Sequence, residues 1–347
     1  MTHSRTLIVG GGLAGTALAW RFWQRGAEFV LVDAGLPVTC SKVAAGLVTP
    51  ITGIRLNTSW RIAELLPEAL AFYDEVASHL GVQFYHHVAQ VRLFRNERDV
   101  QVWRQRQADP AIQRWLEPCP PQPLVDAAAF HEEHGGFQQT GGGWLDTAGY
   151  LAASRDFFIT KGCWLTDTVA DGDIDHCEAS VRWRGETYSS AILCRGAEER
   201  GSTRFFPWLQ WDCARGVIAE IQAELTEHRI VNRNCWLLPR AGGWRAGATY
   251  EFDFEASLAE SAEALRQKLT SLLRAPFEIV SAQAGIRPIL KRRQLVLGRH
   301  PAHSRICVFN GLGSKGALRA PFFSRMLVDH LLDGAALEES VDIAANE

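Results

Sequence analysis

Apolar residues at the start of the chain follow two patterns in turn, first a continuous run and then helical spacing. Residues 6–9 form an apolar run that enters three glycines at 10–12. From residue 13 to 23, small and apolar residues recur at helical spacing, and the next apolar run ends at Asp33. This pattern predicts a strand, a helix and a second strand within about 30 residues, the length of one β-α-β unit.

The rest of the chain alternates between helical and strand periodicity. We expect helices over residues 60–80, within 91–107 after a short strand, near 125–131, and over 146–161, 257–273 and 315–332, and we expect strands over 163–194. Alternation from 213 to 248 predicts a mainly antiparallel sheet. Because β-α-β signals occur at the start, middle and end, we predict a discontinuous nucleotide domain of residues 1–55, 141–200 and 283–340. Residues 56–140 and 201–282 are expected to form a second, α+β domain.

Composition narrows the class of protein. With 347 residues, 47% of them hydrophobic, the chain is long enough for two interwoven domains. A net charge of -3 gives no electrostatic reason to expect nucleic acid or an anionic membrane as partner. The basic run Lys291, Arg292 and Arg293 is expected to be a solvated turn. Eight separate cysteines favour neither a zinc site nor a disulfide framework, and no apolar run reaches membrane-spanning length, so we expect a cytoplasmic protein without a metal.

Gly10, Gly12 and Gly15 form a G-x-G-x-x-G motif between the first predicted strand and helix. Such glycines allow a tight turn, backbone approach to a pyrophosphate and close helix packing, and the helix amides then face the phosphates. Asp33 lies 23 positions after Gly10, where a carboxylate can accept hydrogen bonds from a ribose and would repel a 2'-phosphate. The motif predicts a dinucleotide, but does not distinguish FAD from NAD.

The segment 39–53, TCSKVAAGLVTPITG, follows the second predicted strand. Its small residues allow the backbone to lie against a flat ligand, and Ser41 is suited to a phosphate or ribitol oxygen. An ordinary turn of small residues before a proline would look the same.

Four segments in this order resemble the D-amino-acid oxidase (DAO) superfamily of FAD-dependent oxidoreductases, glycine and sarcosine oxidases among them. They are SKVAAGLVTP after the ribose-binding acid, ILCRGAEE at 192–199, the Gly-x-Arg-Pro motif in AGIRPIL at 284–290, and the C-terminal loop FNGLGSKGALRAP. The resemblance implies an α/β Rossmann-like, glutathione-reductase-like FAD-binding domain with a second α+β domain for substrate. The chain departs from it in KRRQLVLG at 291–298, where the family commonly has an acid and a proline, and in having Asp33 where many members have Glu.

The motifs and the resemblance together imply a noncovalent FAD, because His86, His87 and Cys307 are expected in ordinary strands. The residues assigned to the cofactor are Gly10, Gly12, Leu13, Ala14, Gly15, Asp33, Ala34, Ser41, Lys42, Ala45, Gly46, Leu47, Val169, Gly196, Gly311, Gly313, Ser314, Lys315 and Gly316. The second glycine loop, 311–316, is expected to place a helix N-terminus at the flavin N1/C2 oxygen edge, where charge develops on reduction.

The resemblance implies hydride transfer from the carbon next to an amine to flavin N5, giving an imine that hydrolyses. Arg287 of Gly-x-Arg-Pro is the predicted substrate anchor, because a guanidinium binds a carboxylate bidentately. Tyr250 is predicted to add a hydrogen bond to the same carboxylate, Arg55 to be a second anion anchor, and Lys315 to stabilise the reduced ring. The alternatives are a structural ion pair for Arg287, packing for Tyr250, and solvent exposure for Arg55 and Lys315.

The leading hypothesis is thus an FAD-dependent amine or amino-acid oxidase or dehydrogenase, with oxygen or another carrier as electron acceptor. GLGSKG also resembles the DAO-type domain of the MnmC enzymes, which processes carboxymethylaminomethyl-uridine in tRNA. A third hypothesis is a flavin-binding electron-transfer subunit without its own amine substrate, and a fourth is a NAD-dependent dehydrogenase.

Overall fold

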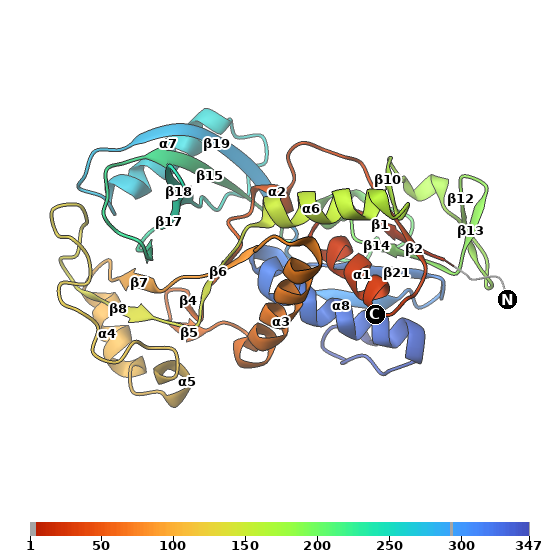
Figure 1. Cartoon of the computed structure of the whole chain (residues 1–347), viewed down its shortest axis with the longest axis horizontal. Helices are drawn as coiled ribbons and strands as arrows, with labels where there is room; N and C mark the ends of the chain where they lie inside the picture. Colours follow the sequence, from red (N-terminus) through yellow and green to blue (C-terminus); the bar gives the residue numbers. More distant parts are fainter. Residues whose placement is uncertain (1–4, 292–293, 347) are drawn as a thin grey trace.

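The computed structural model describes residues 5–291 and 294–346 and consists of two lobes, each built on a sheet (Figure 1). The first sheet has the order β10-β2-β1-β14-β21-β20, and its strands are parallel except for β20, which runs antiparallel to β21. These strands are Trp164–Thr166, Phe29–Asp33, Thr6–Val9, Ser190–Leu193, Ile306–Asn310 and Val296–Arg299. This is the parallel, Rossmann-like arrangement that the first β-α-β pattern predicted.

Alternating side chains of this sheet enter two separate cores. Ile8, Leu31 and Ile192 pack with the main helices of the lobe, and Leu7, Val30 and Leu193 pack against the opposite layer. The helices are α1 (Leu13–Gln24), α3 (Ile62–Leu80), α6 (Thr147–Thr160) and α8 (Gly316–Asp333). The opposite layer is the meander β11 (Asp175–His176), β12 (Val181–Trp183) and β13 (Glu186–Tyr188) together with Phe205 and Phe206.

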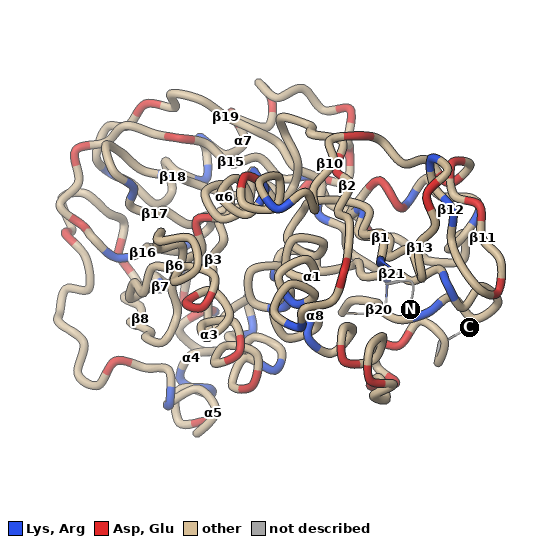
Figure 2. The backbone as a smooth tube through the Cα atoms, turned by 45° about the vertical axis from the view of Figure 1, so that its right-hand side comes forward, with Lys and Arg blue, Asp and Glu red and all other residues tan. Residues whose placement is uncertain are grey.

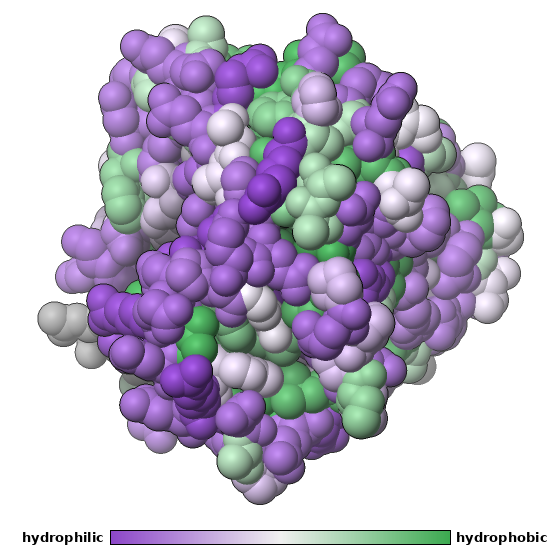
Figure 3. Space-filling view, turned by 90° about the vertical axis from the view of Figure 1, so that its left-hand side faces the viewer, coloured by the Kyte–Doolittle hydropathy of each residue, from purple (hydrophilic) through white to green (hydrophobic). Residues whose placement is uncertain are grey.

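The second lobe is a seven-stranded, mainly antiparallel sheet in the order β19-β15-β18-β17-β16-β7-β8. Its strands are Glu278–Arg287, Ala214–Gln222, Gly243–Gly247, Trp236–Arg240, Ile230–Asn232, Gln90–Leu93 and Gly136–Gln139. One face packs on α7 (Leu258–Thr270), through residues such as Val217 and Leu265. The other face, through Ile218 and Leu238, turns toward the first lobe. Figure 3 shows the outer end of this lobe as mainly hydrophilic surface with hydrophobic residues between.

Shorter elements lie between and around the two lobes. They are α2 (Cys40–Val43), α4 (Glu97–Arg106), α5 (Pro110–Gln113), the small sheet β3-β9-β6 (Leu47–Val48, Gly143–Leu145, Tyr85–His87) and the hairpin β4-β5 (Ile51–Thr52, Asn57–Thr58). Acidic and basic residues are interspersed over both lobes in Figure 2, as expected from the small net charge. Among the described residues, no helix has the length and apolar character to span a membrane.

Most of the predicted elements are confirmed, but the helix near 125–131 is wrong. Residues 126–130 form a turn, because the Asp126 carboxylate accepts from the Ala128 amide and Phe130 pairs with Leu273 in a β-bridge. The expected domain boundary at 283 falls inside β19, and α3 packs on α8 of the first lobe. The predicted solvated turn at Lys291, Arg292 and Arg293 lies partly outside the described residues.

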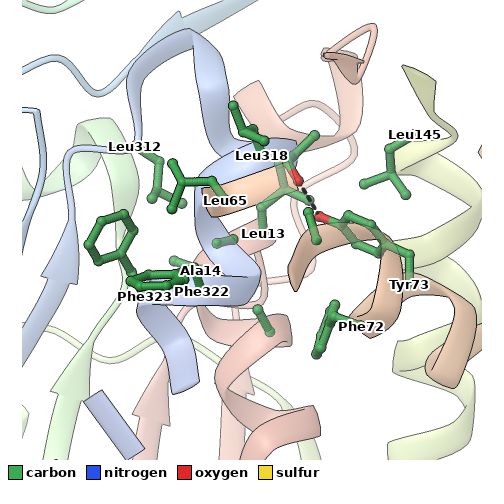
Figure 4. Close-up of a cluster of buried hydrophobic side chains, with 14 of the residues drawn as sticks. Leu13, Ala14, Leu65, Phe72, Tyr73, Leu145, Leu312, Leu318, Phe322 and Phe323 are labelled. Carbon is green, nitrogen blue, oxygen red and sulfur yellow. Dashed lines mark hydrogen bonds between the residues drawn. The ribbon is translucent and has the colours of Figure 1, made fainter. Parts of the chain in front are cut away.

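The contact between α3 and α8 joins the middle of the chain to its end. In Figure 4, Leu65 of α3 lies beside Leu318 of α8, and the Tyr73 hydroxyl donates to the Ala317 carbonyl at 2.9 Å. Because α8 also packs on α1, this contact fixes the segment that follows the second glycine loop.

Replacing Leu65 by Ala tests this core. Leu65 is fully buried, so its truncation should lower the free energy of unfolding by about 2–5 kcal/mol through lost burial and the cavity left behind. Leu332→Ala, at an exposed position of α8, is the matched control and should change it by less than about 0.5 kcal/mol. Urea unfolding of the two variants measures both values, and equal effects would contradict the packing described.

Candidate functional site

A cavity of about 700 Å³ lies between the two sheets. One wall consists of the carboxyl ends of β1, β2, β14 and β21 and the loops that follow them, where ligands bind in open parallel sheets. The opposite wall, which we call the roof, comes from the seven-stranded sheet and contributes Gly216, Ile218, Trp236 and Arg287. Segment 38–47 connects the two walls.

The first glycine turn depends on two backbone contacts. A Cβ at Gly15 would lie 1.9 Å from the carbonyl oxygen of Gly10, so any side chain would push α1 away from β1. Gly10 has φ +104°, and a Cβ there would lie 2.6 Å from the Cys194 carbonyl oxygen. At both positions a neighbouring carbonyl oxygen lies too close for a side chain, so only glycine fits. The motif predicted glycines for a tight turn and close packing of the helix.

Hydrogen-bonding groups converge at this turn. The two carboxylate oxygens of Asp33 accept from the amides of Gly11 at 2.7 Å and Gly35 at 2.9 Å, and each oxygen can accept a further hydrogen bond. Helix α1 has no acidic residue in its first turn and no side-chain cap on Gly12, while Ser41 Oγ accepts from the Leu13 amide at 3.2 Å. The helix start therefore presents amides and positive dipole to an anion.

The segment after the second strand follows the cavity as predicted. Thr39 caps α2 by accepting the Lys42 amide, and Gly46 then has φ +65°, with its missing Cβ 2.0 Å from the Leu145 carbonyl oxygen. This close approach to β9 holds the small residues from Ala44 to Leu47 against the cavity with their backbone toward it.

The second glycine loop completes the same wall. Gly313 has φ +59° and lines the cavity with Ser314. A Cβ at Gly316 would lie 2.9 Å from Leu13 Cδ1, so this glycine lets α8 approach α1. The Asn310 side chain donates to the Gly196 carbonyl at 3.0 Å, which ties the loop to the end of β14.

Two cations, Lys315 and Arg319, lie at the start of α8. Burial lowers the pKa of Lys315 to about 8, with a further contribution from the charge of Arg319. Arg319 is itself buried and donates to the carbonyls of Leu312 and Gln294. Neither side chain lines the cavity, and within the described residues neither forms an ion pair, so the start of α8 carries uncompensated positive charge.

Arg287, at the end of β19, is the cation of the roof. Its guanidinium lies over Gly216, where a Cβ would come within 2.1 Å of Nη2. Its guanidinium donates two long hydrogen bonds, from Nη1 to the Arg215 carbonyl at 3.4 Å and from Nη2 to the Thr249 carbonyl at 3.3 Å. Burial lowers its pKa, and no carboxylate pairs with it among the described residues. By contrast, Arg215 pairs with Glu251.

The predicted cofactor residues converge on this one cavity. All of them line it except Gly15, Gly311 and Lys315, which pack directly beneath the two loops. Tyr250 contacts Arg287 with its ring, 5.5 Å from the guanidinium carbon, but its side chain is 54% exposed. Arg55 lies exposed in the turn between β4 and β5, outside the lining. Its role and that of Tyr250 stay predictions.

Sequence reasoning missed several lining residues. Gly216, Trp236 and Ala248 come from the roof, and Cys40 and Asn310 from the first lobe. The roof residues carry only the signal of strand alternation, which does not reveal the face that meets the other sheet. Asn310 precedes the second glycine loop directly, and that position could have identified it.

A parallel sheet whose strand ends open on a dinucleotide-sized cavity, closed by an antiparallel sheet, defines a two-domain nucleotide-dependent oxidoreductase. The chain belongs to the DAO family of FAD dependent oxidoreductases, whose family model matches residues 5–330. This result excludes the NAD-dependent alternative. The glycine turn, the α1 amides and Asp33 fit the extended pyrophosphate and ribose of FAD.

Solved structures share the fold over the whole chain. Iminodiacetate oxidase from Chelativorans sp. BNC1 is similar with a TM-score of 0.79 at 17% identity, covering 97% of this chain and 98% of its own. Glycine oxidase from Geobacillus kaustophilus has a TM-score of 0.77 at 22% identity, with coverage of 97% and 96%. L-proline dehydrogenase from P. horikoshii has a TM-score of 0.74 at 12% identity, with coverage of 96% and 94%.

Substituting Gly15 by Ala tests the first glycine turn. The added Cβ would collide with the Gly10 carbonyl, so the purified protein should bind FAD at least about tenfold more weakly, or not at all. Gly201→Ala is the control, because a Cβ there meets nothing within 4 Å. Titration of the two apoproteins with FAD, followed by flavin fluorescence, gives the affinities; equal binding would refute the assignment.

Lys315 should give the apoprotein a pH-dependent stability. Its pKa is about 8 when folded and 10.5 ordinarily, so between these values the unfolded chain holds a proton that the folded chain lacks, and stability rises with pH. The unfolding free energy of the wild type should therefore rise by about 2 kcal/mol relative to that of Lys315→Met from pH 8 to pH 10. Urea unfolding at both pH values measures it, and a constant difference would show that Lys315 is solvated.

Proposed function

We propose that this FAD-dependent oxidoreductase oxidises the carbon-nitrogen bond of an amino acid or a secondary amine that carries a carboxylate. The observation that supports this proposal is the Arg287 guanidinium, which is half-buried at the cavity roof and, among the described residues, forms no ion pair with a carboxylate. A buried cation whose hydrogen bonds are long is poorly compensated. A substrate carboxylate would supply the missing charge and two short hydrogen bonds.

The position of Arg287 also orients the substrate. Its guanidinium lies flat on β15 over Gly216, so a carboxylate bound to it would lie at the roof, with the substrate carbon directed toward the opposite wall. Bound FAD supplies the acceptor for the hydride of that carbon. The nitrogen lone pair must be free to form the carbon-nitrogen double bond, so the substrate reacts as a neutral amine. The resulting imine is then hydrolysed by water.

Charge at the far end of the cavity supports the same reaction. The start of α8 presents positive potential, because Lys315 and the buried Arg319 beside it form no ion pair among the described residues. Positive charge fixed in advance stabilises negative charge that develops during a reaction. We assign Lys315 this role toward the reduced cofactor, and we assign Tyr250 to the outer side of the carboxylate, because its ring covers the Arg287 guanidinium.

Arg287→Ala should abolish reduction of the bound flavin by amino acids. The variant loses the bidentate partner of the carboxylate, so kcat/KM should fall at least about a hundredfold, and Arg287→Lys should recover only part of it. Glycine, sarcosine, proline and both enantiomers of other amino acids, mixed anaerobically with the holoenzyme, are tested by bleaching of the flavin band. Arg104→Ala, at an exposed arginine of α4, is the control and should behave like the wild type.

The same experiment separates the other hypotheses. If no amine bleaches the flavin and Arg287→Ala matches the wild type, the amine assignment is wrong and an electron-transfer role gains support. If the purified protein binds tRNA with strong salt dependence and bleaches only with carboxymethylaminomethyl-uridine, the tRNA-modifying alternative replaces it.

A further inference from the structure

Two glycines in the roof hold large side chains flat against the sheet. Gly216 lies under the Arg287 guanidinium, as described above. Gly247, on the neighbouring strand β18, lies under the indole of Trp236, where a Cβ would come within 2.5 Å of Cζ2. At both positions any other residue would displace the ring or guanidinium into the cavity. The roof therefore offers a cation and a flat aromatic surface side by side.

Strand register gives the spacing of these two groups. Ile218 pairs with Gly247, and Gly247 pairs with Trp236, so all three lie in one row across the sheet. Gly216 is two residues before Ile218 on β15, hence on the same face. One strand across and two residues along puts Gly216 and Gly247 about 8 Å apart. Ile218 lies between the guanidinium and the indole.

The surroundings of Trp236 are apolar. It packs with Ile218 and Ala248 of the roof, and with Val43 and Ala45 below, in one hydrophobic cluster. The charged residues that line the cavity are Asp33, Lys42, Asp167, Arg195, Glu198, Arg215 and Arg287. Arg215 of the roof already pairs with Glu251. The other charged lining residues, except Arg287, come from the first lobe. A substituent lying on Trp236 would thus contact hydrocarbon and ring surface.

We infer that Trp236, Ile218 and Ala248 form a subsite for an apolar substituent, and that the substrate is an amino acid with an apolar, preferably flat side chain, or a glycine with such a group on nitrogen. This inference rests on the proposed function, because Arg287 must hold the carboxylate. Beyond the proposed function, it states that Trp236 determines which substituent of the substrate the enzyme prefers. An aromatic ring against the indole gains both buried area and favourable ring geometry.

Steady-state kinetics of the holoenzyme test the subsite. We expect kcat/KM for N-benzylglycine or one enantiomer of phenylalanine to exceed that for glycine, sarcosine and aspartate at least tenfold. Trp236→Ala should lower kcat/KM for the favoured aromatic substrate at least tenfold more than it lowers kcat/KM for glycine. Trp236→Leu, which keeps an apolar side chain, should have an intermediate effect. Trp23→Ala, at a half-buried tryptophan far from the cavity, should preserve the ratio between substrates.

Binding without turnover provides a second measurement. Phenylacetate should bind the oxidised holoenzyme at least tenfold more tightly than acetate by titration calorimetry, and Trp236→Leu should remove most of that difference. If glycine or sarcosine reduces the flavin in an Arg287-dependent way but apolar substituents bring no gain, the subsite is refuted and the proposed function stands. If no amine reduces the flavin and neither phenylacetate nor acetate binds, the subsite and the proposed function are both refuted.

Discussion

The contact between the backbone of Gly15 and the carbonyl of Gly10 is the constraint on which the other parts of this structure depend. It fixes α1 on the end of β1, with the helix amides facing the cavity. Helix α8 then approaches α1 through Gly316 and Leu13, and α3 covers α8 through the Tyr73 and Ala317 hydrogen bond. Segments from the start, the middle and the end of the chain thus meet at one wall, because glycine allows main chains to approach each other.

Glycines also create space in the roof of the cavity, but there the space is filled by side chains instead of main chain. Gly216 and Gly247 leave room on a sheet for a guanidinium and an indole, so two large side chains lie flat and leave space below them. Burial lowers the pKa of Arg287, and no carboxylate among the described residues forms an ion pair with it, so a bound anion would be stabilised there. Under the proposed function, this site binds the carboxylate of the substrate.

Much of the nucleotide side could be predicted from the sequence. Each of its motifs can be recognised from residues that are neighbours in the sequence. They are Gly10 to Gly15, the acid Asp33, the small residues around Gly46 and the loop from Gly311 to Gly316. The turn at 126–130 was mistaken for a helix because its ending depends on a distant pairing with Leu273. The aromatic segment around Phe205 and Phe206 predicts packing between the two domains, whereas both side chains are buried in the layer opposite the main helices of the first lobe.

The sequence by itself determined the class of cofactor, because backbone approach to a phosphate requires glycine at particular spacings and a ribose requires an acid. It also indicated Arg287 through a short motif. Only the tertiary structure decided what surrounds that arginine. Strand alternation does not tell which face of β15, β17 and β18 meets the first lobe, and the side chains that lie beside Arg287 come from strands paired across the sheet. The substrate side of the cavity therefore depends on sheet register, whereas the nucleotide side depends on local turns.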